Sequence, residues 1–245
     1  MTWSQMEPLL YTACLDTLYM VLWSTVYSVL GGLPLGVLLV LTDRGGLLRN
    51  STVNKVIAVV VNVGRSLPFF ILMIALIPFS TLVVGTSIGP TAAVVPLAVS
   101  AIPFFARLVE TAVREVDGGL VEAVQAMGGG TWTVVRKVLL PQSLPSLVAG
   151  LTTTVIALIG YSAMAGAVGG GGLGHLAKTY GYQRFETSLM IITVVLLIVI
   201  VSAVQLAGDL AARSLARRGT SGTAAPLRLL RTRTRARTAA ASEAS

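Results

Sequence analysis

The sequence predicts an all-α integral membrane protein with five transmembrane helices per subunit. Hydrophobic residues make up 54% of the 245 residues and charged residues only 11%, a composition that belongs in a bilayer. The apolar residues fall into five segments, each close to the roughly 20 residues that cross about 30 Å of hydrocarbon. The polar stretches between these segments are too short to hold a soluble domain of conventional size.

The five spans are preceded by residues 1–17, which we expect to form an extracytoplasmic N-terminus. This stretch contains neither a basic n-region nor an A-x-A cleavage site, so the first apolar segment is expected to be retained rather than removed as a signal peptide. Residues 18–212 then form one membrane domain, and residues 213–245 form a basic tail. We place the spans approximately at residues 18–41, 57–79, 91–109, 147–168 and 188–207.

The first span contains Gly32-x-x-x-Gly36, with Pro34 between the two glycines. Small residues at this spacing let a second helix approach the backbone closely. The alternative is a kink caused by glycine and proline, without a dedicated partner helix.

The second span carries Arg65 about ten residues from its start, or about 15 Å along a helix. A guanidinium group facing lipid at such a depth costs roughly 2.5 to 3.5 kcal/mol, so Arg65 should face protein or water. Pro68 should bend the helix nearby. We hypothesise that Arg65, Ser66 and Pro68 lie beside a translocation pathway. The alternative is a structural arginine that snorkels to the membrane surface or bonds to backbone carbonyls.

The polar stretch 110–145 is too long for an ordinary connection between spans. Its middle predicts a short amphipathic helix with Leu120, Val124 and Met127 on one face. Asp117 is expected to cap the start of this helix, and Gly128 to end it in a left-handed conformation. A second helix should begin at Thr131 and stop at Pro141.

This stretch resembles the EAA loop of bacterial ABC importer permeases. The resemblance rests on Glu122-Ala123-Val124, on Gly128, and on Val138-Leu139-Leu140-Pro141, which occur at the spacings of that motif. Val124 replaces the usual alanine. The stretches GRSLPFFILMIALIPF, VGTSIGP and LIGYSAMAGAVGGGGLG resemble more narrowly the methionine-uptake permeases of that superfamily. The likeness extends from about Pro8 to about Arg213.

The resemblance implies a type I ABC importer permease architecture, in which a coupling helix in the loop docks onto a cytoplasmic ATPase dimer. The ATPase, not this chain, would bind ATP and Mg. The alternative is an amphipathic helix lying on the membrane surface. The expected coupling residues are Leu120, Glu122, Ala123, Val124, Met127, Gly128, Leu140 and Pro141.

The glycine run 169–172 is not a phosphate-binding loop, because His175 and Leu176 stand where such a loop needs lysine and serine or threonine. We expect it to form a sharp turn at the outer end of the molecule. His175 and Cys14 are the sole residues of their kinds, so a histidine-rich metal site or a Cys/His pair cannot form within one chain. A serine protease would be the remaining enzymatic alternative, but no G-x-S-x-G motif supports it.

Charge predicts the orientation in the membrane. Fifteen of the eighteen Lys and Arg residues lie in the first loop, in the third loop with the adjoining end of the third span, and in the tail. The positive-inside rule places these parts in the cytoplasm, with the N-terminus outside. The net charge of +8 does not indicate a nucleic-acid-binding face, because eight basic residues lie at or beyond Arg213. We expect the tail to be disordered, either simply solvated or attracted to anionic membrane lipids.

Five spans are few for enclosing a pathway, so we expect a twofold homodimer. By resemblance, the fourth span lines the pore, which makes Tyr161, Ser162 and Met164 candidates for gate or substrate contacts; ordinary interhelix packing is the alternative. The resemblance implies uptake of D- or L-methionine, delivered by an extracytoplasmic binding protein. Another small amino acid, an organic anion or a passive channel are the alternatives for function.

Overall fold

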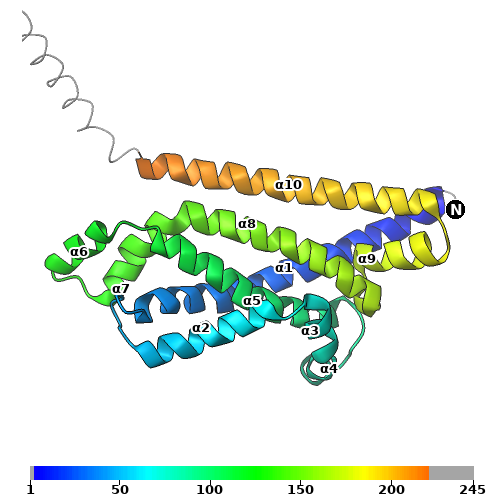
Figure 1. Cartoon of the computed structure of the whole chain (residues 1–245). Coiled ribbons are helices and arrows are strands. Elements are labelled where there is room, and N and C mark those ends of the chain that lie inside the picture. The colour runs from blue at the N-terminus through cyan, green and yellow to red at the C-terminus, as the bar shows by residue number, and fades with distance from the viewer. Residues whose placement is uncertain (1–2, 221–245) are drawn as a thin grey trace, which may run out of the picture.

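The computed structural model describes residues 3–220, and every regular element in this range is helical. The long helices lie side by side along one axis (Figure 1). The N-terminus and α9 (Gly172–Leu176) lie at one end of the bundle, whereas α6 (Gly118–Ala126) and α7 (Thr131–Val134) lie at the other. The long helices are α1 (Trp3–Thr42), α5 (Pro90–Arg114), α8 (Leu140–Ala165) and α10 (Thr187–Thr220).

Within residues 3–220, four stretches of helix are long and apolar enough to cross a membrane, and a fifth is reached if a bent helix pair is counted as one span. That pair consists of α2 (Ser51–Ser66) and α3 (Phe69–Ala75), which meet at 102°. Leu67 and Pro68 adopt extended backbone conformations between them, as expected for a proline and the residue before it. The predicted bend at Pro68 is confirmed. The predicted second span, 57–79, also extends into α4 (Ile77–Val84), a third separate helix that the sequence did not indicate.

Both terminal helices are longer than the spans predicted from hydropathy. Helix α1 begins at Trp3 because Met6 and Leu10 pack against Leu173 and Leu189, and such packing contributes most of the stability of a helix. Residues 3–17, expected to precede the first span, therefore form the first turns of helix α1. Helix α10 continues past Arg213, the expected start of the tail, to Thr220. Residues 221–245 lie outside the described residues.

Helix α5 is central and packs against α1, α2 and α8. Gly32 and Gly36 face it directly: an added Cβ would lie 2.9 Å from the Ile102 carbonyl oxygen at Gly32, and 2.5 Å from the Ala106 carbonyl oxygen at Gly36. The prediction that this glycine pair admits a neighbouring helix is confirmed, and the neighbour is α5.

Pro141 does not stop the helix that begins at Thr131. Helix α7 continues through the π-helical segment η1 (Val135–Leu139) into α8, so the predicted stop is wrong. The Leu140 N–H donates to the Val135 carbonyl, five residues back. This wider turn shifts the hydrogen-bond register just before Pro141, where the missing N–H and the ring would otherwise break an α-helix.

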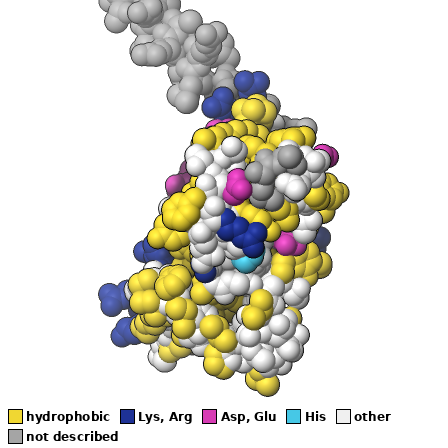
Figure 2. Space-filling model, turned by 90° about the vertical axis from the view of Figure 1, so that its right-hand side faces the viewer, with side chains coloured by type: hydrophobic (Ala, Val, Ile, Leu, Met, Phe, Trp, Pro, Cys, Tyr) yellow, Lys and Arg dark blue, Asp and Glu magenta, His cyan; other side chains and the backbone are white. Residues whose placement is uncertain are grey.

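The opposite end of the bundle turns sharply, as predicted. The π-helical segment η2 (Gly166–Gly170) ends α8, and Gly169, Gly171 and Gly172 have φ angles of +100°, +78° and +73°, which only glycine adopts readily. The chain then reverses into α9, and the segment η3 (Ala177–Gln183) leads into α10. Charged side chains of both signs gather at this end around the histidine (Figure 2).

Candidate functional site

Helix α6 is closed at both ends by its own sequence. The Asp117 carboxylate accepts a hydrogen bond from the Gly119 N–H at 2.9 Å. At the other end Gly128 has φ +81°, its N–H donates to Gln125, and the Gly129 N–H donates to Val124, both at 2.9 Å. These two bonds form a Schellman motif. Both predicted caps are confirmed, and α6 is therefore a discrete, well-delimited helix.

The inner face of α6 differs from the predicted one. Val121 and Val124 are half-buried and pack against the cluster of side chains from α1, α5, α7, η1 and α8 that includes Val113 and Leu139. Leu120 and Met127 are exposed, Met127 at 79%. The prediction grouped Met127 with Val124 by helical spacing, but Met127 lies at the C-cap with non-helical backbone angles, so it leaves that face.

The other predicted coupling residues lie at the same end of the bundle. Glu122 and Ala123 are exposed on α6, and Pro141 is exposed where α8 begins. Leu140 is half-buried and packs against the same apolar cluster as Val124. The motif thus divides into an outward-facing part on α6 and a part that anchors the helix to the bundle.

Sequence reasoning missed Trp132, which is 73% exposed on α7. A large apolar side chain in a polar stretch is a recognisable signal, because tryptophan is enriched among residues that dominate protein interfaces. Together with Leu120 and Met127, it gives this end of the molecule an exposed apolar surface.

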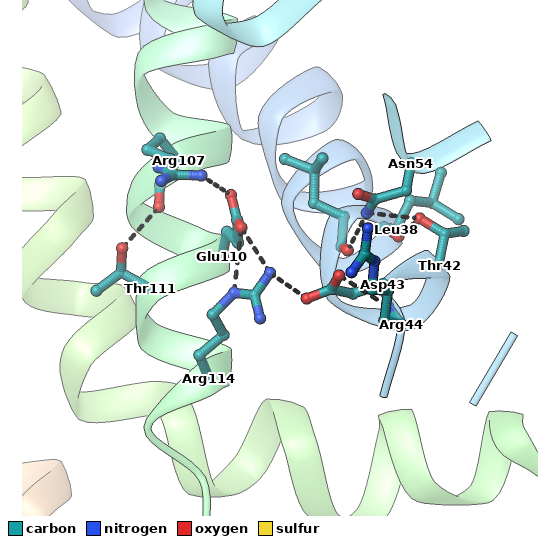
Figure 3. Close-up of polar contacts among 10 residues, drawn as sticks. Leu38, Thr42, Asp43, Arg44, Asn54, Arg107, Glu110, Thr111 and Arg114 are labelled. Atoms are coloured by element: carbon teal, nitrogen blue, oxygen red, sulfur yellow. Dashed lines mark hydrogen bonds and ion pairs between the residues drawn. The ribbon is translucent and has the colours of Figure 1, made fainter. Parts of the chain in front are cut away.

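A charged network lies directly before α6 (Figure 3). Glu110 is buried, with 5% of its surface exposed. Its carboxylate accepts hydrogen bonds from Arg107 at 2.6 Å and from two nitrogens of Arg114 at 3.0 and 3.1 Å. Arg114 also bonds to Asp43 at 2.8 Å. Asp43 and Arg114 are far apart in the sequence, so no local spacing predicts this pair.

Asp43 belongs to the loop between α1 and α2. Its pKa lies below the ordinary aspartate value, because the Arg44 backbone N–H and the Arg114 guanidinium donate to its carboxylate. The group is therefore charged at neutral pH. A cleft of about 780 Å³ opens between this loop and α6, and Asp43, Arg114, Glu122 and Gln125 line it together with apolar side chains.

The candidate pathway residues of the second span surround the break between α2 and α3. Arg65 is exposed in the last turn of α2, where a positive charge is favourable to the helix dipole. Ser66 donates its hydroxyl hydrogen to the Asn62 carbonyl at 2.8 Å. Pro68 is exposed between the two helices. All three lie on the surface of a single protomer.

The candidates of the fourth span face different directions. The Tyr161 ring stacks on Phe69 with centroids 4.6 Å apart, which links α8 to the start of α3 beside Pro68. Ser162 is 1% exposed and donates to the Ile159 carbonyl of its own helix. Met164 is exposed. The structure therefore brings Tyr161 to the helix break, but turns Ser162 into the interior.

Residues 32–220 match the family described as binding-protein-dependent transport system inner membrane component. The chain belongs to this family. The permease is 52% identical, over 82% of its length and 89% of the relative, to a probable D-methionine transport system permease protein of Vibrio cholerae. It is 47% identical, over 82% of its length and 90% of the relative, to a methionine import system permease protein of Bacillus subtilis.

Solved structures support the same assignment. The permease superimposes with a TM-score of 0.86 on a chain of the MetNI methionine ABC transporter in an inward-facing conformation, at 46% identity over 88% of this chain and 99% of that chain. An amino acid ABC transporter crystallised with histidines matches with a TM-score of 0.71 at 21% identity, a likeness of fold alone. The permease therefore has the all-helical fold of ABC importer permeases and is a multi-pass inner-membrane transport component.

Proposed function

We propose that this chain is the membrane-spanning subunit of an ATP-driven importer that takes up D- or L-methionine by alternating access. The observation that carries this proposal is α6: a helix capped at both ends, anchored by Val121 and Val124, with exposed apolar side chains at the end of the bundle. Such a helix can be held by a partner and move the spans to which it is joined.

The partner that holds α6 is a cytoplasmic ATPase dimer, which supplies ATP and Mg binding. Leu120, Met127 and Trp132 contribute the apolar contacts, and Glu122 and Ala123 lie between them on the exposed surface. Gly128, Leu140 and Pro141 set the angle of this unit against the bundle. An amphipathic helix resting on the membrane accounts less well for α6, because its half-buried valines face the protein and not lipid.

Two copies of the chain enclose the pathway, and an extracytoplasmic binding protein delivers methionine to them. Helix α6 lies in the cytoplasm, and the N-terminus and α9 lie outside. The positive-inside rule supports this orientation, because α6 and α9 occupy opposite ends of the bundle and the basic residues concentrate toward the α6 end. Arg65, Ser66, Pro68, Tyr161 and Met164 remain the candidates near the pathway.

The deciding experiment is uptake of labelled L- and D-methionine by proteoliposomes that contain this chain and its ATPase, with the binding protein outside. We expect uptake with ATP inside, and none with a non-hydrolysable analogue. Uptake of another amino acid or an organic anion in place of methionine would overturn the substrate. Flux without ATP would identify a passive channel and overturn the importer.

Docking of α6 is tested by cross-linking in cells. With Cys14 replaced by serine, a cysteine introduced by Ala123→Cys should cross-link to the ATPase. The matched control is Gln183→Cys, an exposed position at the opposite end, which should form no such product. Absence of the product at position 123 would contradict the coupling role.

A further inference from the structure

The junction between α5 and α6 is tied to neighbouring elements on two sides. Arg114, the last residue of α5, bonds to Asp43 in the α1–α2 loop at 2.8 Å. The Glu115 carboxylate accepts a hydrogen bond from Ser146 of α8 at 2.9 Å. Only Glu115 and Val116 separate Arg114 from Asp117, the cap of α6. A displacement of α6 is therefore passed to this junction through a very short connection.

The α1–α2 loop is itself firmly held to the helices that it joins. Asn54 of α2 donates to the Leu39 carbonyl at 2.7 Å and to the Thr42 hydroxyl at 3.1 Å. Backbone N–H groups of Leu48 and Asn50 return to carbonyls of Leu41 and Thr42 at 2.8 and 3.1 Å. A force applied to Asp43 is therefore passed to α1 and α2 and is not lost by bending of a loose loop.

An open cleft lies between helix α6 and this loop. The cleft of about 780 Å³ separates them, with Gly45 and Gly46 on one wall and Val121 and Gln125 on the other. If α6 were pushed toward the loop, the cleft could close without moving α1 and α2. Asp43 and Arg114 both line this cleft, and the bond between them ties the loop directly to the α5–α6 junction.

We propose that Arg114 is a positioning residue for coupling: its guanidinium, shared between Glu110 and Asp43, makes α6, α5 and the α1–α2 loop move as one body. The proposal rests on the proposed function, in which an ATPase moves α6. Buried Glu110 fixes Arg114 through hydrogen bonds from Nε and Nη2, and Nη2 also pairs with the Asp43 carboxylate of the loop. Arginine suits this task because its planar fork binds two carboxylates at once, which a lysine ammonium does less rigidly.

The exposure of the pair separates this role from a purely structural one. The Arg114 and Asp43 side chains are 46% and 34% exposed, and ion pairs of such exposure contribute little to stability. Neutralising Asp43 should therefore leave the fold intact and loosen only the link between the loop and the α5–α6 junction.

The test compares Asp43→Asn and Arg114→Lys with the wild-type complex in proteoliposomes. For Asp43→Asn we expect the number of ATP molecules hydrolysed per methionine transported to rise roughly two- to fivefold, the scale of one partly exposed ion pair. Arg114→Lys should give an intermediate value. The matched control is Asp209→Asn, which removes a half-buried carboxylate on α10 that accepts a hydrogen bond from Gln205 of the same helix; its ratio should equal the wild-type ratio.

A second readout needs no transport. Nitroxide labels are attached after Gly45→Cys and Gln125→Cys, in a chain with Cys14→Ser, across the cleft; a side chain at Gly45 meets open space. Electron-spin distance measurements should give a narrow distribution in this background and a broader one when Asp43→Asn is added. If the wild-type complex transports methionine, an unchanged ratio of ATP hydrolysed to methionine transported in Asp43→Asn overturns the positioning role. If the wild-type complex does not transport methionine, the proposed substrate is wrong. The distance measurement then still tests the positioning role, and an unchanged distribution in Asp43→Asn overturns it.

Discussion

Glu110 is a charged residue that is buried within the bundle. Its carboxylate is almost fully removed from solvent and holds two arginines. Burying an ion is costly unless each of its lone pairs is matched, and here both carboxylate oxygens accept bonds. Neutralising Glu110 should destabilise the fold, because Arg107 and Arg114 would keep their positions but lose the negative charge that they bind.

We expect Glu110→Gln to lower the free energy of unfolding by about 2 kcal/mol, the cost of losing charge-assisted hydrogen bonds to a buried group. Glu115→Gln is the matched control, since Glu115 is exposed and holds one hydroxyl, and it should cost less than about 1 kcal/mol. Denaturant unfolding in detergent micelles measures both. Equal losses for the two variants would contradict the special role of Glu110.

The hydroxyl group of Tyr161 distinguishes a role in the pathway from a role in packing. Its ring stacks on Phe69 at 4.6 Å, and such pairs contribute about 0.5 to 1.5 kcal/mol beyond burial. We expect Tyr161→Phe to keep stability and uptake, and Tyr161→Ala to lower the unfolding midpoint because the stack is lost. If Tyr161→Phe abolished uptake while remaining folded, the hydroxyl would act on the substrate and the packing account would fail.

At the scale of elements, the contact between α1 and α5 depends on glycines. An added Cβ at Gly36 would meet the backbone oxygen of Ala106 at 2.5 Å, and backbone cannot move aside as a flexible side chain can. We expect Gly36→Ala to cost about 1 to 3 kcal/mol by overpacking. Gly160→Ala is the matched control, because Gly160 lies in a long helix with open space around it. Its thermal midpoint should match or exceed that of the wild type.

The end of α6 depends on a different property of glycine. Gly128 has room for a side chain, but its φ is +81°, and a non-glycine residue in that conformation costs about 1 to 2 kcal/mol. We expect Gly128→Val to fray the Schellman motif, so that ATP is hydrolysed without matching uptake. Gly118→Ala, at an open position without positive φ, should keep coupling. Measuring hydrolysis and uptake in the same vesicles checks this; intact coupling in Gly128→Val would count against docking of α6.

At the scale of the whole molecule, the two ends of the bundle differ in what they present. One end carries α6 with its exposed apolar side chains, and the other carries α9, the glycine turn and mixed charges (Figures 1 and 2). Because the long helices cross the bilayer, the two ends of the bundle face different compartments.

Orientation is checked with a thiol reagent that does not cross membranes, in a chain with Cys14→Ser. In intact spheroplasts we expect labelling after Gln183→Cys and none after Ala123→Cys; permeabilised cells should label both. Both positions are exposed on the protein surface, so a difference in labelling reports the side of the membrane and not burial of the cysteine. Labelling of position 123 in intact spheroplasts would place α6 outside and overturn the proposed orientation.

Local patterns were sufficient for much of this protein. Hydropathy indicated several membrane-crossing helices, glycine spacing indicated a close helix contact, and Asp117 and Gly128 indicated the limits of α6, because caps and left-handed turns involve residues close together in sequence. The coupling motif likewise lies within one short stretch. These features led directly to the family.

Other features required the fold, because they depend on residues distant in sequence. Asp43 meets Arg114, Tyr161 stacks on Phe69, and Met6 packs on Leu173, and no local spacing predicts such pairs. The division of the second span into three helices and the passage of a helix through Pro141 are also tertiary outcomes, since packing decides whether a proline ends a helix or is accommodated by a wider turn. The sequence by itself determined the membrane class and the limits of α6, because both depend on local patterns; the tertiary structure decided which charges tie the α5–α6 junction to the α1–α2 loop, because those residues are distant in the sequence.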